Sequence, residues 1–392
     1  MKTFRFRFFV LVLISFTLGC GEFLVPGILT NLANSFKMPL ASIGLLVTVF
    51  ALVYAISTPI ITIFIGKYRY YKTFVLMMLV YIGGLILSAI ATNYILLVIS
   101  RVVTASVSGA LLSVALTFGN AIASEKQRGM MISWVFSGFS IASVVGMPIG
   151  TYVTHVANWH VAFGVVVTMS VVTLVLGMLS LPKDLQAGYT KEDGNQFALL
   201  KDPLIIVGVL VPLFGSSGIN VFHTYVAPII TDELHFGAEM LSVLLSVIGI
   251  ISIFSSQLSG VLANNHGLKK MPYVFVLQMA LFAIVGSLYS NSLVSLLVIF
   301  ILELTFSLLG SSIEIHFMDV AEKFYPQSMV FASSLNPVFF NLGISVGSAS
   351  GSMIISSSGL KNLGFGSIGF IVIELCLLTI LNKMISRRGL SE

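Results

Sequence analysis

The chain consists of long apolar segments separated by short polar ones. A window of about 19 residues finds apolar segments near 8–30, 41–66, 71–92, 94–122, 131–155, 160–182, 204–231, 238–264, 271–290, 292–319, 326–355 and 364–386. Each is long enough for an α-helix to cross a hydrocarbon core about 30 Å thick. The pattern therefore predicts an all-α integral membrane protein with twelve transmembrane helices.

The first segment, MKTFRFRFFVLVLISFTLGCGEFLVPG, allows two interpretations. A lipoprotein signal peptide would have a basic start, an apolar stretch and the sequence TLGC, which would make Cys20 the first mature residue. An uncleaved membrane helix would continue past Cys20, and the apolar run does continue through Phe23, Leu24 and Ile28. We therefore expect a transmembrane helix, which places the carboxylate of Glu22 deep in the bilayer.

Composition agrees with a membrane protein. Hydrophobic residues make up 57% of the 392 residues and charged residues only 9%, whereas a soluble domain has about 25% charged residues. The net charge of +5 does not indicate a nucleic-acid partner, because the basic residues are sorted by membrane side. Cys20 and Cys376 both lie in apolar runs, which favours neither a disulfide nor a cysteine metal site.

The distribution of Lys and Arg predicts the orientation, because these residues concentrate in cytoplasmic loops. If the N-terminus is cytoplasmic, only Lys37 and Lys361 lie outside, and Arg101 falls within the fourth span. The other seventeen of the 20 Lys and Arg then lie inside. Both termini are therefore predicted to be cytoplasmic.

The chain divides into two similar halves. The longest polar segment, 183–203, is predicted to be a cytoplasmic linker between an N-terminal six-helix bundle (1–182) and a C-terminal one (204–392). At an offset of about 200 residues, GEFLVPGI (21–28) matches NVFHTYVAPII (220–230), and Arg101 falls opposite Glu303. A duplicated six-span unit is typical of secondary transporters, whose substrate site lies between the repeats.

Small residues recur at four-residue spacing in two spans. They are Gly138, Ala142, Gly146 and Gly150 in span five, with Pro148 between them, and Gly343, Gly347 and Gly351 in span eleven. Such faces let helix backbones approach closely. They are packing surfaces first, and they could also act in gating if the two halves move against each other.

Other function classes lack support. GISVG (343–347) fits G-x-S-x-G, but a nucleophile elbow needs a strand-to-helix turn, and this is the middle of a membrane helix. The sequence has neither H-E-x-x-H nor a P-loop lysine motif. We therefore expect no enzyme activity and no cofactor, and energy for transport would come from an ion gradient.

Several motifs resemble the major facilitator superfamily, in its twelve-helix drug:proton antiporter branch near the sugar- and purine-efflux permeases. They are GEFLVPGILTNLANSFKMPLASIGLLVTVFALVYAISTP at the start, ISRVVTASVSGA (99–110), SGFSIASVVGMPIG (137–150) and SSLNPVFFNLGISVGSASG (333–351). The resemblance implies an antiporter of the bacterial inner (plasma) membrane. It also implies that spans one and four line the substrate cavity.

Charges inside the membrane are where function is expected, because each costs about 3 kcal/mol or more unless paired or hydrated. Glu22 lies roughly 21 Å from the cytoplasmic side of span one, and Arg101 roughly 10 Å from the outer side of span four. In a core about 30 Å thick these depths coincide. We predict a direct or water-bridged pair, with Glu22 as the principal proton carrier and Glu303 as the fallback; Arg101 could instead be a static brace.

Other polar residues follow helical spacing. Span ten has a stripe of Glu303, Ser307, Gly310 and Glu314, with the two carboxylates eleven residues apart and so about 20° apart in azimuth. Span seven carries Ser216, Asn220 and His223, and span eleven adds Asn336 and Asn341. We predict that Asn220, His223, Glu314, Asn336 and Asn341 line the substrate cavity. The alternatives are that Ser and Asn simply hold helices together and that Glu314, close to the cytoplasmic interface, is simply solvated. Glu374 in span twelve has no predicted role.

These features predict a proton-coupled secondary transporter that exports a small organic solute. The resemblance supplies the direction and the proton. The alternatives are an uptake symporter for a sugar or nucleoside, and a membrane scaffold or receptor, against which the intramembrane charges argue. The expected partners are a small-molecule substrate, protons and the lipid bilayer, with no nucleic acid, and the transporter is expected to be a monomer.

Overall fold

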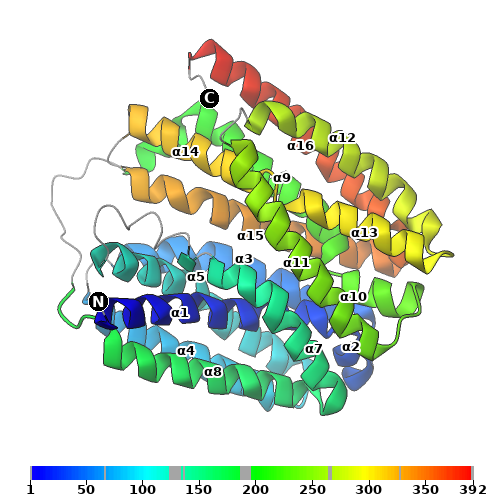
Figure 1. Ribbon diagram of the computed structural model, residues 1–392, viewed down its shortest axis with the longest axis horizontal. Helices are drawn as coiled ribbons and strands as arrows, with labels where there is room; N and C mark the ends of the chain where they lie inside the picture. Colours follow the sequence, from blue (N-terminus) through cyan, green and yellow to red (C-terminus); the bar gives the residue numbers. More distant parts are fainter. Residues whose placement is uncertain are drawn as a thin grey trace. The chain divides into compact units, whose positions relative to one another are not determined.

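The structure is a computed structural model that describes residues 2–65, 68–122, 134–135, 137–185, 196–263, 267–325 and 328–389. Its elements within these ranges are helices (Figure 1). Twelve helical segments are long and apolar enough to cross a membrane. The prediction of an all-α protein with twelve spans is confirmed.

Within the described residues, the first six spans are built from α-helices with one π-helical turn. Spans one to four and six are α1 (Lys2–Gly27), α3 (Leu40–Ile65), α4 (Tyr70–Ala89), α5 (Tyr94–Ile122) and α8 (Trp159–Ser180). Span five consists of residues 137–141, the π-helical turn Ala142–Gly146 and α7 (Met147–Val156). The short helix α2 (Leu29–Phe36) follows span one. The helix of span one passes through Cys20 without interruption.

The last six spans include two that are built from several pieces. Span seven contains α9 (Pro203–His223), α10 (Val226–Pro228) and the π-helical turn Ile229–Glu233, and span ten contains α13 (Ser292–Phe306) and α14 (Gly310–Phe324). The other spans are α11 (Ala238–Ala263), α12 (Gly267–Val285), α15 (Met329–Ser358) and α16 (Leu363–Arg387), and short 3-10 turns lie at Gln196–Lys201, Gly286–Leu288 and Leu360–Asn362.

Prolines explain two of the irregularities. A proline has no N–H to donate to the carbonyl four residues earlier, and its ring crowds that carbonyl. For Pro148 that residue is Val144, which lies within the π-helical turn. For Pro228 it is Thr224, in the gap between α9 and α10. Both spans therefore deviate from regular α-helix where the backbone hydrogen bond is lost.

The chain forms two compact units. Unit 1 contains Met1–Pro39, Val49–Tyr189 and Gly237–Gly249, and unit 2 contains Leu40–Thr48, Thr190–Phe236 and Ile250–Glu392. Each unit thus holds most of one half of the chain and a short helical segment from the other half. Of the predicted linker 183–203, residues 186–195 lie outside the described residues, and the predicted domain boundaries stay a prediction.

In each unit, some helices contact several neighbours. In unit 1, α1 contacts α5, α7 and α8, and α4 lies against α5 and α8. In unit 2, α9 contacts both α15 and α16, and α12 packs on α16. Figure 1 shows these neighbours running side by side within each unit. The candidates Glu22, Arg101 and His223 therefore lie on helices that pack against several neighbours.

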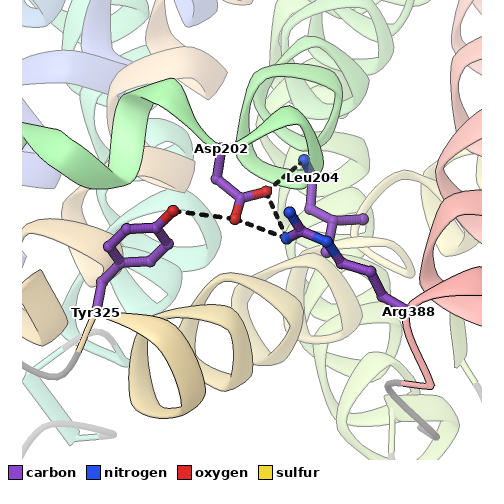
Figure 2. A network of polar contacts seen from close by, with 4 residues as sticks. All are labelled: Asp202, Leu204, Tyr325 and Arg388. Atoms are coloured by element: carbon purple, nitrogen blue, oxygen red, sulfur yellow. Dashed lines mark hydrogen bonds and ion pairs between the residues drawn. The ribbon is translucent and has the colours of Figure 1, made fainter.

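A buried carboxylate fixes the start of α9 (Figure 2). Asp202 is 2% exposed and caps the helix by accepting a hydrogen bond from the Leu204 N–H at 2.9 Å. Arg388 Nη1 donates to both carboxylate oxygens, at 2.9 and 2.7 Å, and the Tyr325 hydroxyl donates at 3.3 Å. Partial burial and the neighbouring Asp202 carboxylate raise the pKa of Tyr325, so this hydroxyl keeps its proton. The network joins the ends of α14 and α16 to the start of α9.

Candidate functional site

Arg101 of α5 is almost completely buried, with 1% of its surface exposed. Its Nη1 donates a hydrogen bond to the Gly21 carbonyl at 2.7 Å, and its guanidinium carbon lies 4.1 Å from the centroid of the Phe50 ring. Arg101 Nε has no hydrogen-bond partner among the described residues. A permanent charge in the membrane is costly without polar or aromatic partners, and α1 and α3 supply them here.

Glu22 follows Gly21 on α1 and is partly exposed. The described residues form three ion pairs, which are His223–Glu303, Lys361–Glu233 and Arg388–Asp202. Arg101 bonds to the carbonyl of Gly21, the residue before Glu22, but Glu22 and Arg101 do not form one of these ion pairs. Of the two predicted arrangements, the direct pair is thus absent within the described residues, and the water-bridged pair stays a prediction.

Aromatic side chains complete the surroundings of Arg101. Phe50 and Tyr54 of α3 pack with Ala105 of α5, and the Tyr81 hydroxyl of α4 donates to the Thr17 carbonyl at 3.2 Å. Tyr81 comes this close because residue 21 is glycine; a Cβ there would overlap the hydroxyl. Sequence reasoning missed these aromatic residues because such residues are ordinary packing residues in an apolar span.

Glu303 of α13 is the centre of a polar cluster in unit 2. Its side chain is 6% exposed, and its Oε2 lies 3.5 Å from Nε2 of His223 on α9, whose side chain is 25% exposed. The Ser252 hydroxyl of α11 donates a hydrogen bond to Oε1 of Glu303. The His223 ring stands edge-on to Phe306 at 6.0 Å between centroids. Two titratable groups from different helices therefore meet in this cluster.

Span ten is broken just after Glu303. α13 ends at Phe306 and α14 begins at Gly310. Two serines of α11 bond backbone groups at the break. The Ser255 hydroxyl accepts a hydrogen bond from the Ser307 N–H at 3.1 Å. The Ser259 hydroxyl accepts from the Ser311 N–H at 3.0 Å and donates to the Leu308 carbonyl at 3.0 Å.

The break corrects one prediction. A stripe from Glu303 to Glu314 at a fixed azimuth requires a continuous helix, and that premise is wrong because the chain leaves the helix at 307–309. A signal for the break was present in the sequence. Ser252, Ser255 and Ser259 recur at three- and four-residue spacing, which places them on one face of α11.

The other predicted cavity residues lie on several helices. The Asn220 amide donates to its own helix, at 2.9 Å to the Ser216 carbonyl. Glu314 of α14 interacts with the side chain of Asn336 on α15. Asn341 donates to the Pro337 carbonyl at 3.1 Å, while its side-chain oxygen is buried with no partner among the described residues. Their contact with a substrate stays a prediction.

The small residues of span five lie against α1. A Cβ at Gly138 would overlap the Ser15 hydroxyl, one at Gly146 the Cys20 sulfur, and one at Gly150 the Leu24 side chain. Pro148 lies at the start of α7, directly after the π-helical turn. Close packing of α1 on span five therefore depends on these glycines.

The small residues of span eleven pack in the same way on α9. A Cβ at Gly343 would overlap the Leu213 carbonyl, and one at Gly347 would overlap the Ser217 carbonyl. Spans one and seven thus make equivalent close contacts in the two units. Whether these contacts also act in gating stays a prediction.

Glu374 of α16 is 3% exposed. Its carboxyl group lies where a side chain at Gly215 of α9 would be. It has no hydrogen-bond or ion-pair partner in the part of the chain that the structure describes. The glycine therefore explains how α9 accommodates this carboxyl group.

Residues 11–348 match the family model described as Major Facilitator Superfamily. The chain belongs to this superfamily. Its members are membrane transporters, so this chain is a multi-pass membrane transporter and not an enzyme.

Relatives in the superfamily cover almost the whole chain. The uncharacterized MFS-type transporter YtbD of Bacillus subtilis (strain 168) is 25% identical over 96% of this chain and 95% of its own length. The inner membrane transport protein YdhP of Escherichia coli (strain K12) is 24% identical over 93% and 92%. A probable sugar efflux transporter of Helicobacter pylori (strain ATCC 700392 / 26695) is 25% identical over 94% and 93%.

Solved structures share the major facilitator fold. A bacterial homologue of the human lysosomal transporter Spinster, in an inward-facing and unoccupied conformation, has a TM-score of 0.82 at 14% identity and covers 98% of each chain. A D-xylose-proton symporter has a TM-score of 0.76 at 14% identity, over 95% of this chain and 96% of its own. At this identity the likeness shows the fold alone.

Proposed function

We propose that this transporter is a proton-coupled carrier that exports a small organic solute, such as a drug, a sugar or a purine, by alternating access. The observation that carries the proposal is the His223–Glu303 pair beside the break in span ten. Both side chains can bind and release a proton. Ionisable groups inside a membrane are rare because of their cost, and they mark ion and proton pathways.

Protonation of Glu303 changes its contacts. The ionised carboxylate accepts the Ser252 hydroxyl hydrogen bond and attracts a protonated His223. A neutral Glu303 no longer provides this attraction. The imidazole of His223, which is partly exposed, is then free to contact a solute. Proton binding on α13 is thereby coupled to a group on α9.

Unit 1 holds a second candidate for proton coupling. Arg101 cannot release its proton in a protein, so it needs partners in every state of the cycle. Its contacts with the Gly21 carbonyl and Phe50 provide them whether Glu22 is charged or neutral. Glu22 can then exchange its proton beside a fixed positive charge, as the sequence predicts for the principal carrier.

Transport assays test the proposal. The transporter is reconstituted in proteoliposomes, and counterflow is measured for a panel of sugars, purines and cationic drugs. For molecules inserted inside-out, export coupled to protons accumulates the solute in vesicles with an acidic lumen. Accumulation from an acidic exterior would instead identify an uptake symporter. Movement that does not respond to a pH gradient of either sign would contradict proton coupling.

Two variants identify the proton carrier. Glu22→Gln and Glu303→Gln each remove one titratable group while preserving shape. The variant at the true carrier loses accumulation driven by the pH gradient and keeps counterflow, because counterflow needs no net proton movement. Glu322→Gln, at an exposed position of α14, is the matched control and keeps both activities. If both test variants accumulate solute like the wild type, neither carboxylate is the carrier.

A further inference from the structure

A pocket of about 430 Å³ lies between the start of α12 and the end of α16. Pro272, Thr379, Asn382, Lys383, Ser386 and Arg387 line it. Two cations, an amide and two hydroxyls thus border one space. None of these residues belongs to the groups around Arg101 or Glu303.

The geometry of the pocket follows from Pro272. Because proline has no N–H, the carbonyl of Leu268, four residues earlier, lacks its helical partner. The Asn382 amide of α16 donates to that carbonyl at 3.0 Å. This bond fixes the ends of the two helices against each other, so the pocket is part of the packed structure.

The ends of α12 and α16 carry uncompensated positive charge. Lys383 and Arg387 lie one turn apart on α16, and Lys269 and Lys270 lie in the first turn of α12, all of them exposed. None of the four has an ion-pair partner within the described ranges. α12 has no carboxylate, and the carboxylate of α16, Glu374, is buried in mid-span.

The nearby acid Asp202 does not balance the charges of Lys383 and Arg387, because it already pairs with Arg388. Arg388 follows Arg387 directly, and it pairs with Asp202, whose carboxylate is 2% exposed and already accepts from Leu204 and Tyr325. Asp202 therefore has no capacity left for the other cations. The pocket is electropositive, and it favours an anion.

The surface beside the pocket is apolar and exposed. Tyr273 is 79% exposed, Val276 54% and Ile380 49%. These residues lie in spans nine and twelve, and exposed apolar side chains of a membrane span suit contact with lipid. Tyr273 lies within the first two turns of α12, and aromatic side chains with a polar tip favour such interfacial positions. The pocket is therefore continuous with a surface that suits acyl chains.

We propose that this pocket binds the phosphate headgroup of an anionic phospholipid. Lys383 and Arg387 pair with the phosphate, Ser386 donates a hydrogen bond, and the acyl chains lie along Tyr273, Val276 and Ile380. Basic pockets between membrane helices are suited to anionic headgroups. The adjoining apolar surface favours a lipid over free phosphate, because only a lipid has both a phosphate for the pocket and acyl chains for the apolar surface. The proposal does not depend on the transported solute or on proton coupling.

Lipid binding to the full-length, delipidated protein in detergent tests the proposal. Native mass spectrometry is used to titrate phosphatidylglycerol and, separately, phosphatidylcholine. The wild type should bind phosphatidylglycerol more tightly. At about 1 kcal/mol per basic residue, the double variant Lys383→Gln/Arg387→Gln should bind it roughly tenfold to thirtyfold more weakly. The control Arg69→Gln/Lys72→Gln removes the same charge at exposed positions before and in α4 and should bind like the wild type.

Two further measurements separate the possible outcomes. Ser386→Leu fills the pocket without changing the charge and should also weaken binding of phosphatidylglycerol, provided that the variant elutes as a folded monodisperse protein. Inorganic phosphate should not displace the lipid. The proposal is overturned if the double variant and the wild type bind phosphatidylglycerol equally, if the control loses as much affinity, or if inorganic phosphate competes fully.

Discussion

At the scale of single residues, the buried charged side chains of this transporter bond to backbone groups as well as to other side chains. Arg101 donates to the Gly21 carbonyl, and Asp202 accepts from the Leu204 N–H. Such bonds keep a charge satisfied when a neighbouring titratable group changes its protonation state. The role of each charged side chain can therefore be tested by replacing it with an uncharged residue or with a residue of the same charge and another shape.

Substitution of Arg101 should reduce transport. Arg101→Ala removes the hydrogen bond to Gly21 and the contact with Phe50, and we expect the counterflow rate per reconstituted protein to fall at least about tenfold. Arg101→Lys should recover only part of this rate, because lysine keeps the charge but loses the planar guanidinium. Arg69→Ala, at an exposed arginine, should transport like the wild type. Equal rates for Arg101→Ala and the wild type would show that Arg101 is not needed for transport.

Substitution of Arg388 should reduce stability. In Arg388→Ala the Asp202 carboxylate stays buried but loses both bonds from the guanidinium, and we expect a loss of about 1–3 kcal/mol. Thermal unfolding in a neutral detergent measures this as a lower Tm. Arg5→Ala, which removes an exposed arginine, should leave the Tm unchanged. An Arg388→Ala protein with the Tm of the wild type would mean that Asp202 finds other partners.

At the scale of helices, the close contacts depend on glycine where one backbone meets another. Gly347→Ala would place a Cβ against the Ser217 carbonyl of α9, and we expect the Tm to fall by an amount equivalent to about 1–3 kcal/mol. Gly369→Ala on α16 is the matched control, because open space surrounds that position. Alanine is a better helix former than glycine by about 1 kcal/mol, so helix propensity alone would not lower the Tm of either variant. The interpretation fails if both variants unfold at the same temperature.

The helices also show which features of the fold the hydrophobic pattern predicts and which it does not. The apolar segments predicted twelve spans because a membrane helix must be long and apolar whatever its neighbours are. The break in span ten was not predicted, since the segment around Ser307 is apolar enough to read as continuous. At the break, Ser255 and Ser259 of another helix accept hydrogen bonds from the backbone N–H groups of Ser307 and Ser311. Such a partner belongs to tertiary structure.

At the scale of the whole molecule, the predicted orientation can be tested directly. In a background of Cys20→Ala/Cys376→Ser, single cysteines at Asp232 and Lys361 should react with an impermeant thiol reagent from outside the cell. Cysteines at Lys72 and Lys323 should react only after the membrane is opened. The expectation rests on the excess of Lys and Arg in one set of loops. Labelling of position 323 in intact cells would reverse the orientation.

The sequence alone determined the properties that depend on local composition. The number of spans and the presence of Glu22, Arg101 and Glu303 within apolar segments can be read from it, because membrane insertion requires apolar length and makes each charge conspicuous. The equal depth of Glu22 and Arg101 followed from helical rise.

Only the tertiary structure decided which groups these charges meet. Arg101 bonds to the Gly21 carbonyl and not directly to Glu22, and Glu303 meets His223 and Ser252. Depth along a helix constrains one coordinate, whereas a contact at hydrogen-bond distance also requires the rotation of each helix and the identity of its neighbours. Close packing, such as that of the Tyr81 side chain against Gly21, sets those rotations, and no single segment of the sequence determines them.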